Sequence, residues 1–504
     1  MPKTISSPIQ SSSLRNRLGL ISGPLLFFIL LLMPISDGLS AEGQAVLATT
    51  VWMAIWWISE AAPLAVTALL PVVLFPVTGG LEAAATTSAF GQPIIFLFLG
   101  GFVIALAMEK WNLHRRIAIS IVLSVGDNPA RMILGFMLAT ALLSMWISNT
   151  ATALMMMPIG TAIIQQFREG AASDQSERFG KMLMLSIAYS ASIGGMATLI
   201  GTPTNAIFVA IVKQLFDVEI SFAKWMLIVL PISSLLLGVC WYYLTKITYP
   251  IQLHHLGGGK EEIRRMQDEL GPMSREEKYV LAVFTLTAIC WITRSLLLVR
   301  LLPGLNDTAI AIAGGIALFL IPARTRQSPM LMTWKDTTQL PWGILLLFGS
   351  GLTIAAGFRS SGLAQWIGEQ LTAIGTIELL LIILIVVAMI NFLTEITSNV
   401  ATATVMLPIL ASLSVAIGVH PYGMMLGACV AASCAFMLPV ATPPNAVVFG
   451  SGLVTIRDMS RTGLWMNLIS VVLLTLFVYY LFPLIWDIDL QVLPDAFRTE
   501  VSIP

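Results

Sequence analysis

Two nearly identical polar stretches interrupt the apolar sequence of this chain, SNTATALMMMPI at residues 148–159 and SNVATATVMLPI at residues 398–409. They share 8 of 12 positions at a spacing of 250 residues. A second pair of motifs follows them, since GTPTNA at residues 201–206 matches ATPPNA at residues 441–446. Chance similarity between apolar helices does not reproduce a polar pair, an A-T-A run and a terminal P-I together. The sequence therefore indicates two copies of one structural unit.

The composition around these motifs indicates a protein that lies mainly in lipid. Of the 504 residues, 57% are hydrophobic and 11% are charged, whereas about a quarter of the residues of soluble domains are charged. Apolar runs such as residues 18–33 and 379–392 are continuous, which favours membrane-spanning helices over the alternating strands of a β-barrel. The formal net charge is zero, so charge indicates no nucleic-acid partner. We expect an all-α polytopic membrane protein in contact with lipid.

Eleven apolar stretches have the length and composition of transmembrane helices. They lie at residues 19–36, 44–58, 62–78, 92–109, 182–215, 222–246, 279–298, 305–322, 341–358, 421–456 and 462–486. Two further stretches, 131–165 and 379–417, are too long for one ordinary span and carry Ser-Asn at their middles. We interpret them as re-entrant hairpins. The predicted fold is about 11 transmembrane helices plus two re-entrant helical hairpins in two inverted repeats.

Basic residues predict the side of the membrane to which each hairpin opens, because basic loops favour the cytoplasm. Both flanks of the 131–165 stretch are basic, with Lys110, Arg115, Arg116 and Arg131 on one side and Arg168, Arg178 and Lys181 on the other. We therefore expect the 131–165 hairpin to open to the cytoplasm. The flanks of the 379–417 stretch are mostly non-basic, so we expect that hairpin to open outward. With a cytoplasmic N-terminus the two copies are inverted, which is typical of secondary transporters with a site near the bilayer midplane.

The predicted organisation has five parts. Residues 1–40 are the N-terminal segment and first transmembrane helix, 41–247 inverted repeat 1, 248–277 a cytoplasmic connector, 278–490 inverted repeat 2, and 491–504 an extracytoplasmic tail. The charged run EEIRRMQDEL in the connector predicts a short helix at the membrane surface. We expect a multi-pass protein of the cell inner (plasma) membrane.

The polar motifs are candidate binding residues because each of them interrupts a helix. In lipid an interruption leaves backbone groups without partners, which is tolerated only where protein, water or a ligand satisfies them. Pro203, Pro443 and Pro444 free upstream carbonyls, which are suitable ligands for a hard cation such as sodium. Ser and Asn side chains at residues 148–149 and 398–399 add neutral oxygens. The helices that start near Thr150, Val400, Asn205 and Asn445 present N–H groups to an anion.

The same residues also allow structural roles. Ser-Asn pairs occur as hydrogen-bonding contacts between membrane helices, and a proline break can be a simple kink. Glu60 lies either at a cytoplasmic turn or in a site, and Glu395 either stabilises the second hairpin or tunes a cation site. We interpret Cys240, Cys290, Cys429 and Cys434 as packed small hydrophobes, and His114, His254, His255 and His420 as surface residues.

The combination of SNTATA, TSNVATATVMLPI, GTPTNA and VATPPNAVVFG resembles the divalent anion/sodium symporter family, which includes bacterial dicarboxylate transporters and animal citrate and dicarboxylate carriers. The likeness covers essentially residues 15–490, and residues 392–450 are especially similar to the animal citrate carriers. The resemblance implies a homodimer that works as an elevator, in which a substrate-carrying domain slides against a dimerising scaffold.

The resemblance also implies the ligands, matched residue by residue. The first sodium site would use Ser144, Ser148, Asn149 and Gly201, and the second would use Thr394, Thr397, Asn399 and Ala441, several through backbone carbonyls. The substrate carboxylates would contact Asn149, Thr150, Ser398, Asn399 and Pro443. Val400 stands where many bacterial members have Thr. It removes one hydroxyl from the substrate site, and the choice between dicarboxylate and citrate stays open.

Sodium also has a physical rationale, because the motifs contain neither Arg nor Lys. An anion with two or three charges cannot enter a low-dielectric site without compensation, which bound cations supply. We expect a sodium-coupled symporter of C4-dicarboxylates, citrate or both. The alternatives are a sodium-independent dicarboxylate exchanger and a sulfate carrier. An intramembrane enzyme or receptor is disfavoured, because no His-Asp-Ser set, metal cluster or nucleotide loop occurs within the predicted spans.

Overall fold

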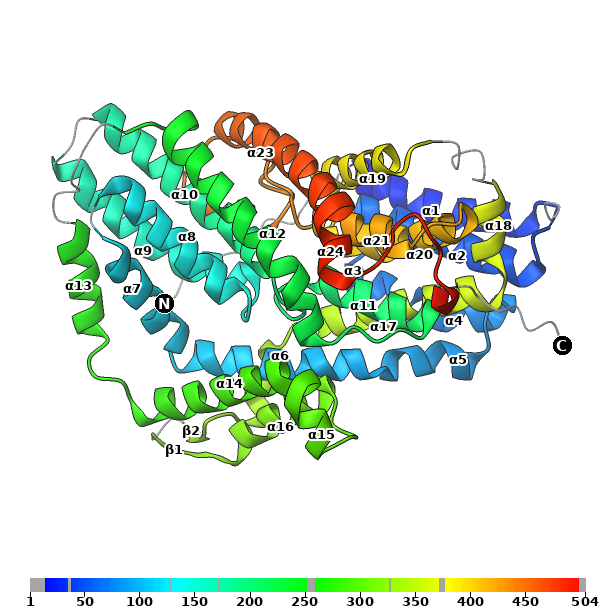
Figure 1. The fold of residues 1–504 in the computed structure, drawn as a ribbon, viewed down its shortest axis with the longest axis horizontal. Coiled ribbons are helices and arrows are strands. Elements are labelled where there is room, and N and C mark those ends of the chain that lie inside the picture. The colour runs from blue at the N-terminus through cyan, green and yellow to red at the C-terminus, as the bar shows by residue number, and fades with distance from the viewer. Residues whose placement is uncertain are drawn as a thin grey trace, which may run out of the picture.

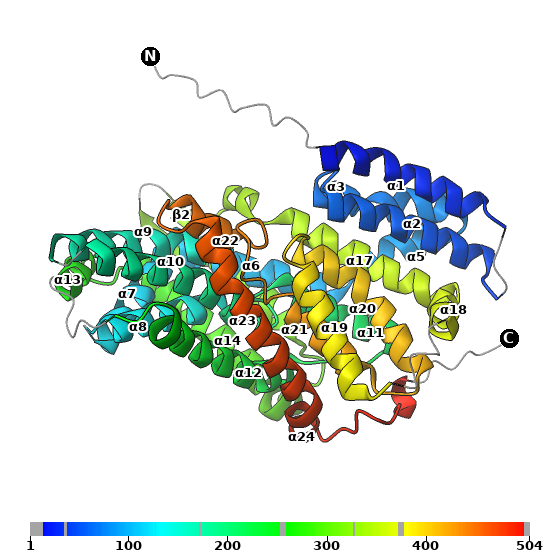
Figure 2. The same ribbon diagram turned by 90° about the horizontal axis from the view of Figure 1, so that it is seen from above.

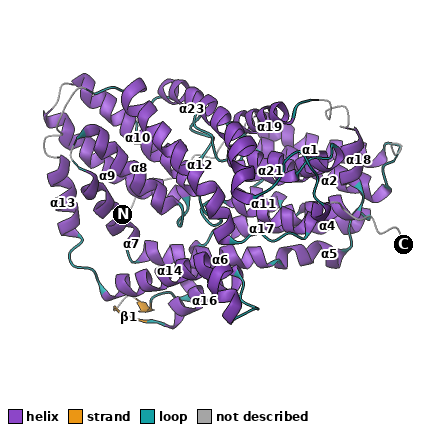
Figure 3. Cartoon of the chain, viewed as in Figure 1, coloured by secondary structure: helices purple, strands orange, loops and turns teal. Residues whose placement is uncertain are grey.

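The computed structural model describes residues 14–34, 38–126, 128–170, 173–251, 259–325, 328–370 and 377–497. Within these ranges the protein is mostly helical (Figure 3). Their strands are β1 (Pro322–Thr325) and β2 (Ser328–Met330), which pair antiparallel in a small ribbon. The predicted all-α class is therefore confirmed for the part of the chain that is described.

The helices follow one another along the whole chain. The first half contains α1 (Leu14–Leu32), α2 (Ala41–Ser59), α3 (Leu64–Thr67), α4 (Leu70–Thr78), α5 (Ala83–Ser88), η1 (Ala89–Gly91), α6 (Pro93–Lys110), α7 (Leu113–Val125), α8 (Pro129–Ser144), α9 (Asn149–Gly170), α10 (Ser173–Gly195), α11 (Pro203–Phe216), α12 (Phe222–Tyr242) and η2 (Tyr243–Thr248). The second half contains α13 (Gly259–Glu269), α14 (Arg275–Thr293), η3 (Arg294–Leu298), α15 (Val299–Leu301), α16 (Asp307–Leu320), η4 (Trp334–Gln339), α17 (Trp342–Ser360), α18 (Leu363–Gln370), α19 (Leu379–Leu393), α20 (Asn399–Ala416), α21 (Pro421–Ala431), α22 (Pro443–Gly450), α23 (Ile456–Leu476), η6 (Phe477–Leu481), α24 (Phe482–Trp486) and η7 (Asp495–Phe497).

Many of these helices have the length and composition of membrane spans. In the described residues, 7 helical segments are long and apolar enough: Arg15–Leu32, Ala83–Lys110, Phe222–Thr248, Arg275–Leu301, Trp342–Ser360, Asn399–Ala416 and Ile456–Trp486. Shorter apolar helices include α8, α11, α19 and α21, which lie where the sequence predicts hairpin arms or interrupted spans. Asn399–Ala416 is long enough to cross alone, although the sequence assigns it to a hairpin. The chain is a multi-pass membrane protein.

Segments that are far apart in sequence meet at the centre of the molecule. α17 contacts α2, α6, α11 and α20, and Figure 2 shows it between the α1–α2 pair and the group of α19, α20 and α21. Figure 1 shows α1, α2, α4 and α5 toward one end of the long axis and α7–α10 with α13 toward the other. The non-helical segments that follow α10 and α21 lie in the interior of the bundle, since residues 196–202 and 432–436 are buried.

Two pairs of neighbouring helices flank the Ser-Asn motifs. α8 and α9 are joined by residues 145–148, and both pack on α10. α19 and α20 are joined by residues 394–398, and both pack on α21. Each pair of helices thus packs on the helix that follows it in the same copy of the repeat, before the interruption.

The connector contains the predicted surface helix, since α13 covers Gly259–Glu269 and packs on α7 and α9. The cysteine interpretation is also confirmed, because all four are free, three of them are buried and Cys290 is partly buried. The prediction that His420 is a surface residue is wrong. His420 is 2% exposed and packs between the rings of Tyr422 and Phe497, because the segment after α24 folds back and Leu490 O accepts the His420 N–H.

The other histidines differ in their surroundings. His114 is partly buried, with Nδ1 lying 3.0 Å from Met108 O. His254 and His255 lie outside the described residues. The surface interpretation of the histidines therefore stays untested for this pair and fails clearly for His420 alone.

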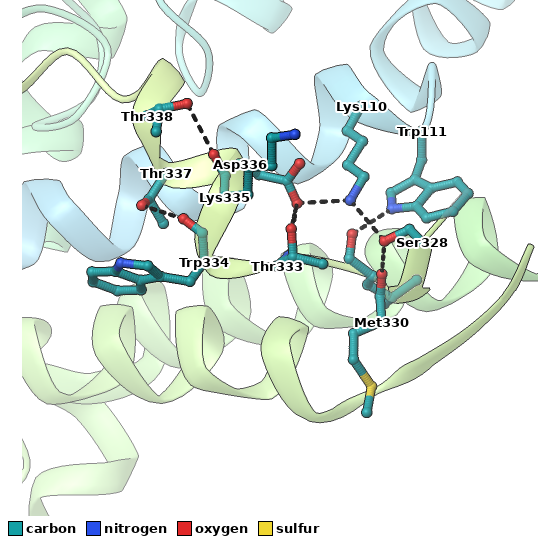
Figure 4. Close-up of polar contacts among 11 residues, drawn as sticks. Lys110, Trp111, Ser328, Met330, Thr333, Trp334, Lys335, Asp336, Thr337 and Thr338 are labelled. Atoms are coloured by element: carbon teal, nitrogen blue, oxygen red, sulfur yellow. Dashed lines mark hydrogen bonds and ion pairs between the residues drawn. The ribbon is translucent and has the colours of Figure 1, made fainter. Parts of the chain in front are cut away.

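A polar cluster attaches the β ribbon and η4 to the end of α6 (Figure 4). Lys110 Nζ lies 2.8 Å from Asp336 Oδ2 and 3.1 Å from Ser328 Oγ, while Thr333 donates to the same Asp336 oxygen. Burial by itself would raise the pKa of Asp336, but the hydrogen bonds from Lys110 and Thr333 outweigh it and hold the pKa below its usual value. The carboxylate is therefore charged at neutral pH and fixes this segment.

Gly100 tests the close packing of α6 on α16. A Cβ at Gly100 would lie 2.5 Å from the backbone carbonyl carbon of Ala311, so Gly100→Ala forces the two helices apart. We expect a loss of about 1–3 kcal/mol of unfolding free energy, measured as a lower thermal midpoint in detergent. Gly238→Ala is the matched control, because a Cβ there meets nothing within 4 Å and alanine favours the helix. Equal effects of the two substitutions would contradict this packing.

Candidate functional site

The turn between α8 and α9 gathers oxygen atoms around Gly201. Ser144 Oγ lies 2.5 Å from Asn149 Oδ1 and 2.7 Å from Ala191 O. A Cβ at Gly201 would collide with Gly195 O and would lie 2.9 Å from Ser144 O, and a Cβ at Gly195 would collide with Asn149 Oδ1. Glycine at both positions therefore allows the carbonyl, hydroxyl and amide oxygens to approach one another. Neutral oxygens of this kind are the ligands that hard cations prefer.

The turn between α19 and α20 repeats these contacts. Thr394 Oγ1 lies 2.6 Å from Asn399 Oδ1 and 3.1 Å from Ala432 O, and both residues of the first pair stand 250 positions after Ser144 and Asn149. Thr397 Oγ1 lies 2.7 Å from Thr402 Oγ1. Of the predicted cation ligands, Ser144 and Asn149 are thus in contact across the first turn, and Thr394 and Asn399 across the second. Gly201 and Ala441 lie outside the turns, directly before α11 and α22.

The asparagine of each Thr-Pro-x-Asn motif holds the non-helical segment before it. Asn205 Nδ2 donates to the carbonyls of Met196 and Thr198, at 3.0 and 2.6 Å. Asn445 Nδ2 donates to those of Ala435 and Leu438, at 3.1 and 3.0 Å. Part of the backbone that the interruption leaves unpaired is therefore satisfied by side chains, as apolar surroundings require.

Contacts between the two copies bring the interruptions side by side. Thr204 Oγ1 lies 3.1 Å from Ser433 Oγ, and Cys429 Sγ donates to Thr204 O at 3.4 Å. α9 begins at the first turn and packs on α22, which begins at the interruption of the second copy. α20 begins at the second turn and packs on α11, which begins at the interruption of the first copy. Among the described residues no hydrogen bond joins the two turns directly, so Ser148 and Ser398 are linked only through these helices.

Burial separates the predicted ligands into two layers. Most of the predicted cation ligands are buried: Ser144, Gly201, Thr394, Thr397 and Ala441. The predicted anion contacts are partly or fully accessible: Asn149, Thr150, Ser398, Asn399, Val400 and Pro443. Ser148 is exposed, and its Oγ accepts the N–H of Ala151 at 3.2 Å. Asn149 and Asn399 are partly buried and belong to both predicted sets, so each side-chain amide can contact the buried cation ligands on one side and the accessible anion contacts on the other.

Glu395 stabilises the second interruption. Its carboxylate accepts the N–H groups of Phe436, Met437 and Leu438, at 2.7, 2.9 and 3.0 Å. The amide of Asn467 donates to it at 2.7 Å, and Glu395 is only 3% exposed. Of the two roles that the sequence leaves open, the contacts favour the stabilising one. Glu60 lies at the turn that ends α2, in a left-handed conformation with φ of 52°.

Sequence reasoning missed two polar residues that contact the interruptions and one aromatic residue within the first turn. Ser433 and Asn467 are polar residues within apolar stretches, which is a signal that could have found them. Trp146 lies two positions before Ser148, and a large aromatic residue in an otherwise small, polar turn is a comparable signal.

Interrupted helices with accessible polar turns inside an apolar bundle define this protein as a membrane transporter. The family model described as "Sodium:sulfate symporter transmembrane region" matches residues 16–486. The chain belongs to this family of divalent anion/sodium symporters. The predicted resemblance is thereby confirmed, and the chain is a transporter and not an enzyme.

Curated relatives match almost the whole chain. The chain is 47% identical over 481 residues to the sodium-dependent dicarboxylate transporter SdcS of Staphylococcus aureus (strain bovine RF122 / ET3-1), covering 94% of this chain and 92% of the relative. It is 47% identical over 493 residues to SdcS of Staphylococcus saprophyticus, covering 96% and 95%.

Two solved structures share the fold. The Alcanivorax borkumensis YdaH transporter has a TM-score of 0.55 at 14% identity, covering 78% of this chain and 86% of that one. Neisseria gonorrhoeae MtrF has a TM-score of 0.52 at 11% identity, covering 95% and 96%. At these identities the likeness concerns the fold alone.

Glu395→Gln tests the stabilising role of this carboxylate. The amide loses the charge and one acceptor oxygen, and hydrogen bonds to charged groups contribute about 1.5–3 kcal/mol. We expect an unfolding free energy about 1–3 kcal/mol lower and faster amide exchange at residues 436–438. Glu60→Gln, at an exposed turn, is the control and should change neither. Unchanged exchange at residues 436–438 would show that the carboxylate does not hold this segment.

Proposed function

We propose that this protein is a sodium-coupled symporter of C4-dicarboxylates in the cell inner (plasma) membrane. The observation that carries the proposal is the layered site, in which buried neutral oxygens lie beneath accessible hydroxyl, amide and helix-terminal N–H groups. The two SdcS relatives, which are named as sodium-dependent dicarboxylate transporters, support the same substrate and the same coupling ion. Citrate is the second candidate substrate, because Val400 removes one hydroxyl from the accessible layer, where the substrate carboxylates are placed.

Sodium ions are the cationic cargo in this proposal. The first ion is held by Ser144, Ser148, Asn149 and Gly201, and the second by Thr394, Thr397, Asn399 and Ala441. The oxygen cluster around Gly201 supports the first assignment, and the Thr394–Asn399 contact supports the second. Bound cations lower the cost of placing a dianion in a site whose motifs contain no basic side chain.

The substrate carboxylates occupy the accessible layer. Asn149, Thr150, Ser398, Asn399 and Pro443 lie at the first residues of α9, α20 and α22 or directly before them. The N-termini of helices present free N–H groups and a partial positive charge. Ser398 precedes α20 without a capping hydrogen bond from its side chain, which leaves its hydroxyl available to a carboxylate.

The proposed mechanism is an elevator in a homodimer. The two re-entrant hairpins, α8–α9 and α19–α20, form part of two inverted repeats at residues 41–247 and 278–490, and they carry the site with α10–α11 and α21–α22. This unit slides against α6, α14, α16 and α17. The N-terminus and the connector at residues 248–277 face the cytoplasm, and residues 491–504 face the outside.

Uptake into proteoliposomes tests the function. Labelled succinate should accumulate when an inward sodium gradient is imposed, and potassium or choline in place of sodium should abolish accumulation. Labelled citrate and competition by sulfate rank the alternative substrates. Succinate counterflow that proceeds equally without sodium would overturn the symporter and support a sodium-independent exchanger.

Asn149→Ala and Asn399→Ala test whether one amide serves both layers. Each amide oxygen is assigned to a sodium ion, and the neighbouring N–H groups are assigned to the substrate. Because binding linkage is reciprocal, each substitution should weaken succinate and sodium together, by roughly tenfold for one lost charged hydrogen bond. Weaker succinate binding with an unchanged dependence on sodium would restrict these residues to the anion.

Val400→Thr tests the selectivity of the accessible layer. Val400 is partly buried, and threonine is nearly the same size, so the packing should survive. A new hydroxyl can donate to a carboxylate, and about 1.4 kcal/mol corresponds to a tenfold change in affinity. We expect the ratio of succinate to citrate affinity to shift roughly tenfold, whereas Thr150→Val should weaken both substrates. An unchanged ratio with unchanged affinities would place Val400 away from the substrate.

A further inference from the structure

The turn between α8 and α9 is anchored by one aromatic side chain. The Trp146 ring lies 5.9 Å from that of Phe222 in a stacked arrangement with an interplanar angle of 22°. It lies 5.1 Å from the Phe284 ring in an edge-to-face arrangement and 6.5 Å from the Trp291 ring at 10°. Three rings from α12 and α14 therefore surround a residue that stands two positions before Ser148.

The platform beneath Trp146 is rigid. Phe222 and Trp291 are 0% and 1% exposed and stack on each other at 4.7 Å. Both are tied to Asp307, because the Phe222 N–H donates to Asp307 Oδ2 at 2.8 Å and the Trp291 indole donates to Asp307 O at 2.9 Å. Arg294 Nε lies 2.7 Å from Asp307 Oδ1. A platform held by an ion pair and two hydrogen bonds defines where the indole can lie.

The anchor is present in one copy of the sequence unit and absent from the same position of the other. Ile396 is the residue 250 positions after Trp146, and it is 56% exposed. The second turn is attached instead through Glu395, whose carboxylate accepts the backbone N–H groups of residues 436–438. The two turns therefore hold equivalent Ser-Asn pairs by different means, and only the first depends on stacking.

The position of Trp146 connects this stack to the oxygen cluster. Ser144 and Asn149, whose oxygens approach Gly201, stand on either side of the four-residue turn at 145–148. Within that turn Met145 O accepts a hydrogen bond from Thr198, and Ile147 is 1% exposed. Trp146 supplies a third restraint, and its ring partners lie outside the α8–α11 segment.

We propose that Trp146 is a positioning residue, whose stack on Phe222, Phe284 and Trp291 holds the α8–α9 turn in the geometry that binds the first cation, in the position of the sliding unit that the structure describes. The inference rests on the proposed sodium-coupled function and names a determinant of its sodium affinity. A ligand that binds one of two conformations has an apparent affinity reduced by the fraction of the competent one. Saturating sodium drives the turn back into the competent geometry, so the effect concerns sodium and not the carboxylate contacts.

The expected size follows from the three ring contacts. Each aromatic contact shifts a conformational equilibrium by roughly two- to twelvefold. Trp146→Leu should therefore raise the sodium concentration for half-maximal succinate uptake at least threefold. The KM for succinate at saturating sodium should stay within twofold of the unchanged protein. Trp146→Phe, which keeps a ring on the platform, should stay close to the unchanged protein in both quantities.

The matched variants separate positioning from general damage. Ile396→Leu at the equivalent exposed position should change neither quantity. Phe284→Leu removes one of the three ring contacts from the opposite side and should raise the sodium requirement roughly two- to twelvefold. This variant keeps the inference testable if Trp146→Leu does not fold. An unchanged sodium requirement in Trp146→Leu, or an equal loss of succinate affinity at saturating sodium, would overturn the proposal.

A labelling experiment distinguishes a failure of this inference from a failure of the proposed function. Ile147→Cys reports on the turn without altering a proposed ligand, and Ile147 is 1% exposed, so its labelling should be slow. It is combined with Cys290→Ser, because the other three native cysteines are buried, and the full-length protein is treated with a thiol reagent in detergent. Adding Trp146→Leu should speed labelling at least threefold, and sodium should restore the slow rate, whereas potassium should not. Faster labelling without any effect of sodium overturns the sodium function and keeps the positioning role. Unchanged labelling overturns the positioning role itself.

Discussion

The structure depends on one constraint: backbone groups at a helix interruption need partners when the surroundings are apolar. Four interruptions occur at corresponding places in the two copies, and each has its own set of partners. Asn205 and Asn445 bond the carbonyls before their helices, and the Glu395 carboxylate accepts three consecutive N–H groups. The first N–H groups of a helix have no partner within that helix. The proposed site lies where α9, α20 and α22 begin, so such groups are available to a ligand there.

The fold class and the helix interruptions could be predicted because their signals are local. Long apolar runs indicate helices, and the Thr-Pro pairs predict the non-helical segments that end at Pro203 and Pro443. The family was equally accessible, since the two Ser-Asn stretches and the two Thr-Pro-x-Asn stretches occur together in one chain. The charged connector helix followed from its composition for the same reason.

The remaining features depend on contacts between distant segments, which local patterns do not contain. His420 was expected at the surface because it stands beside a loop, but the segment after α24 covers it with Phe497. Glu395 could not be assigned to one role, because its donors are 41 or more positions away. Trp146 gave no sign of its partners, since Phe222, Phe284 and Trp291 belong to two other helices. In each case the deciding fact is what another part of the chain places beside the residue.

The pairing of Thr204 with Ser433 has a consequence for how the protein is made. These two residues are 229 positions apart, and α9 and α11 pack on α22 and α20 of the other copy. A ribosome adds roughly 5–20 residues each second, so the first copy waits tens of seconds for its neighbours. During that interval the first copy lies in the membrane without the helices on which α9 and α11 pack. It therefore reaches its final packing only after the second copy has been inserted.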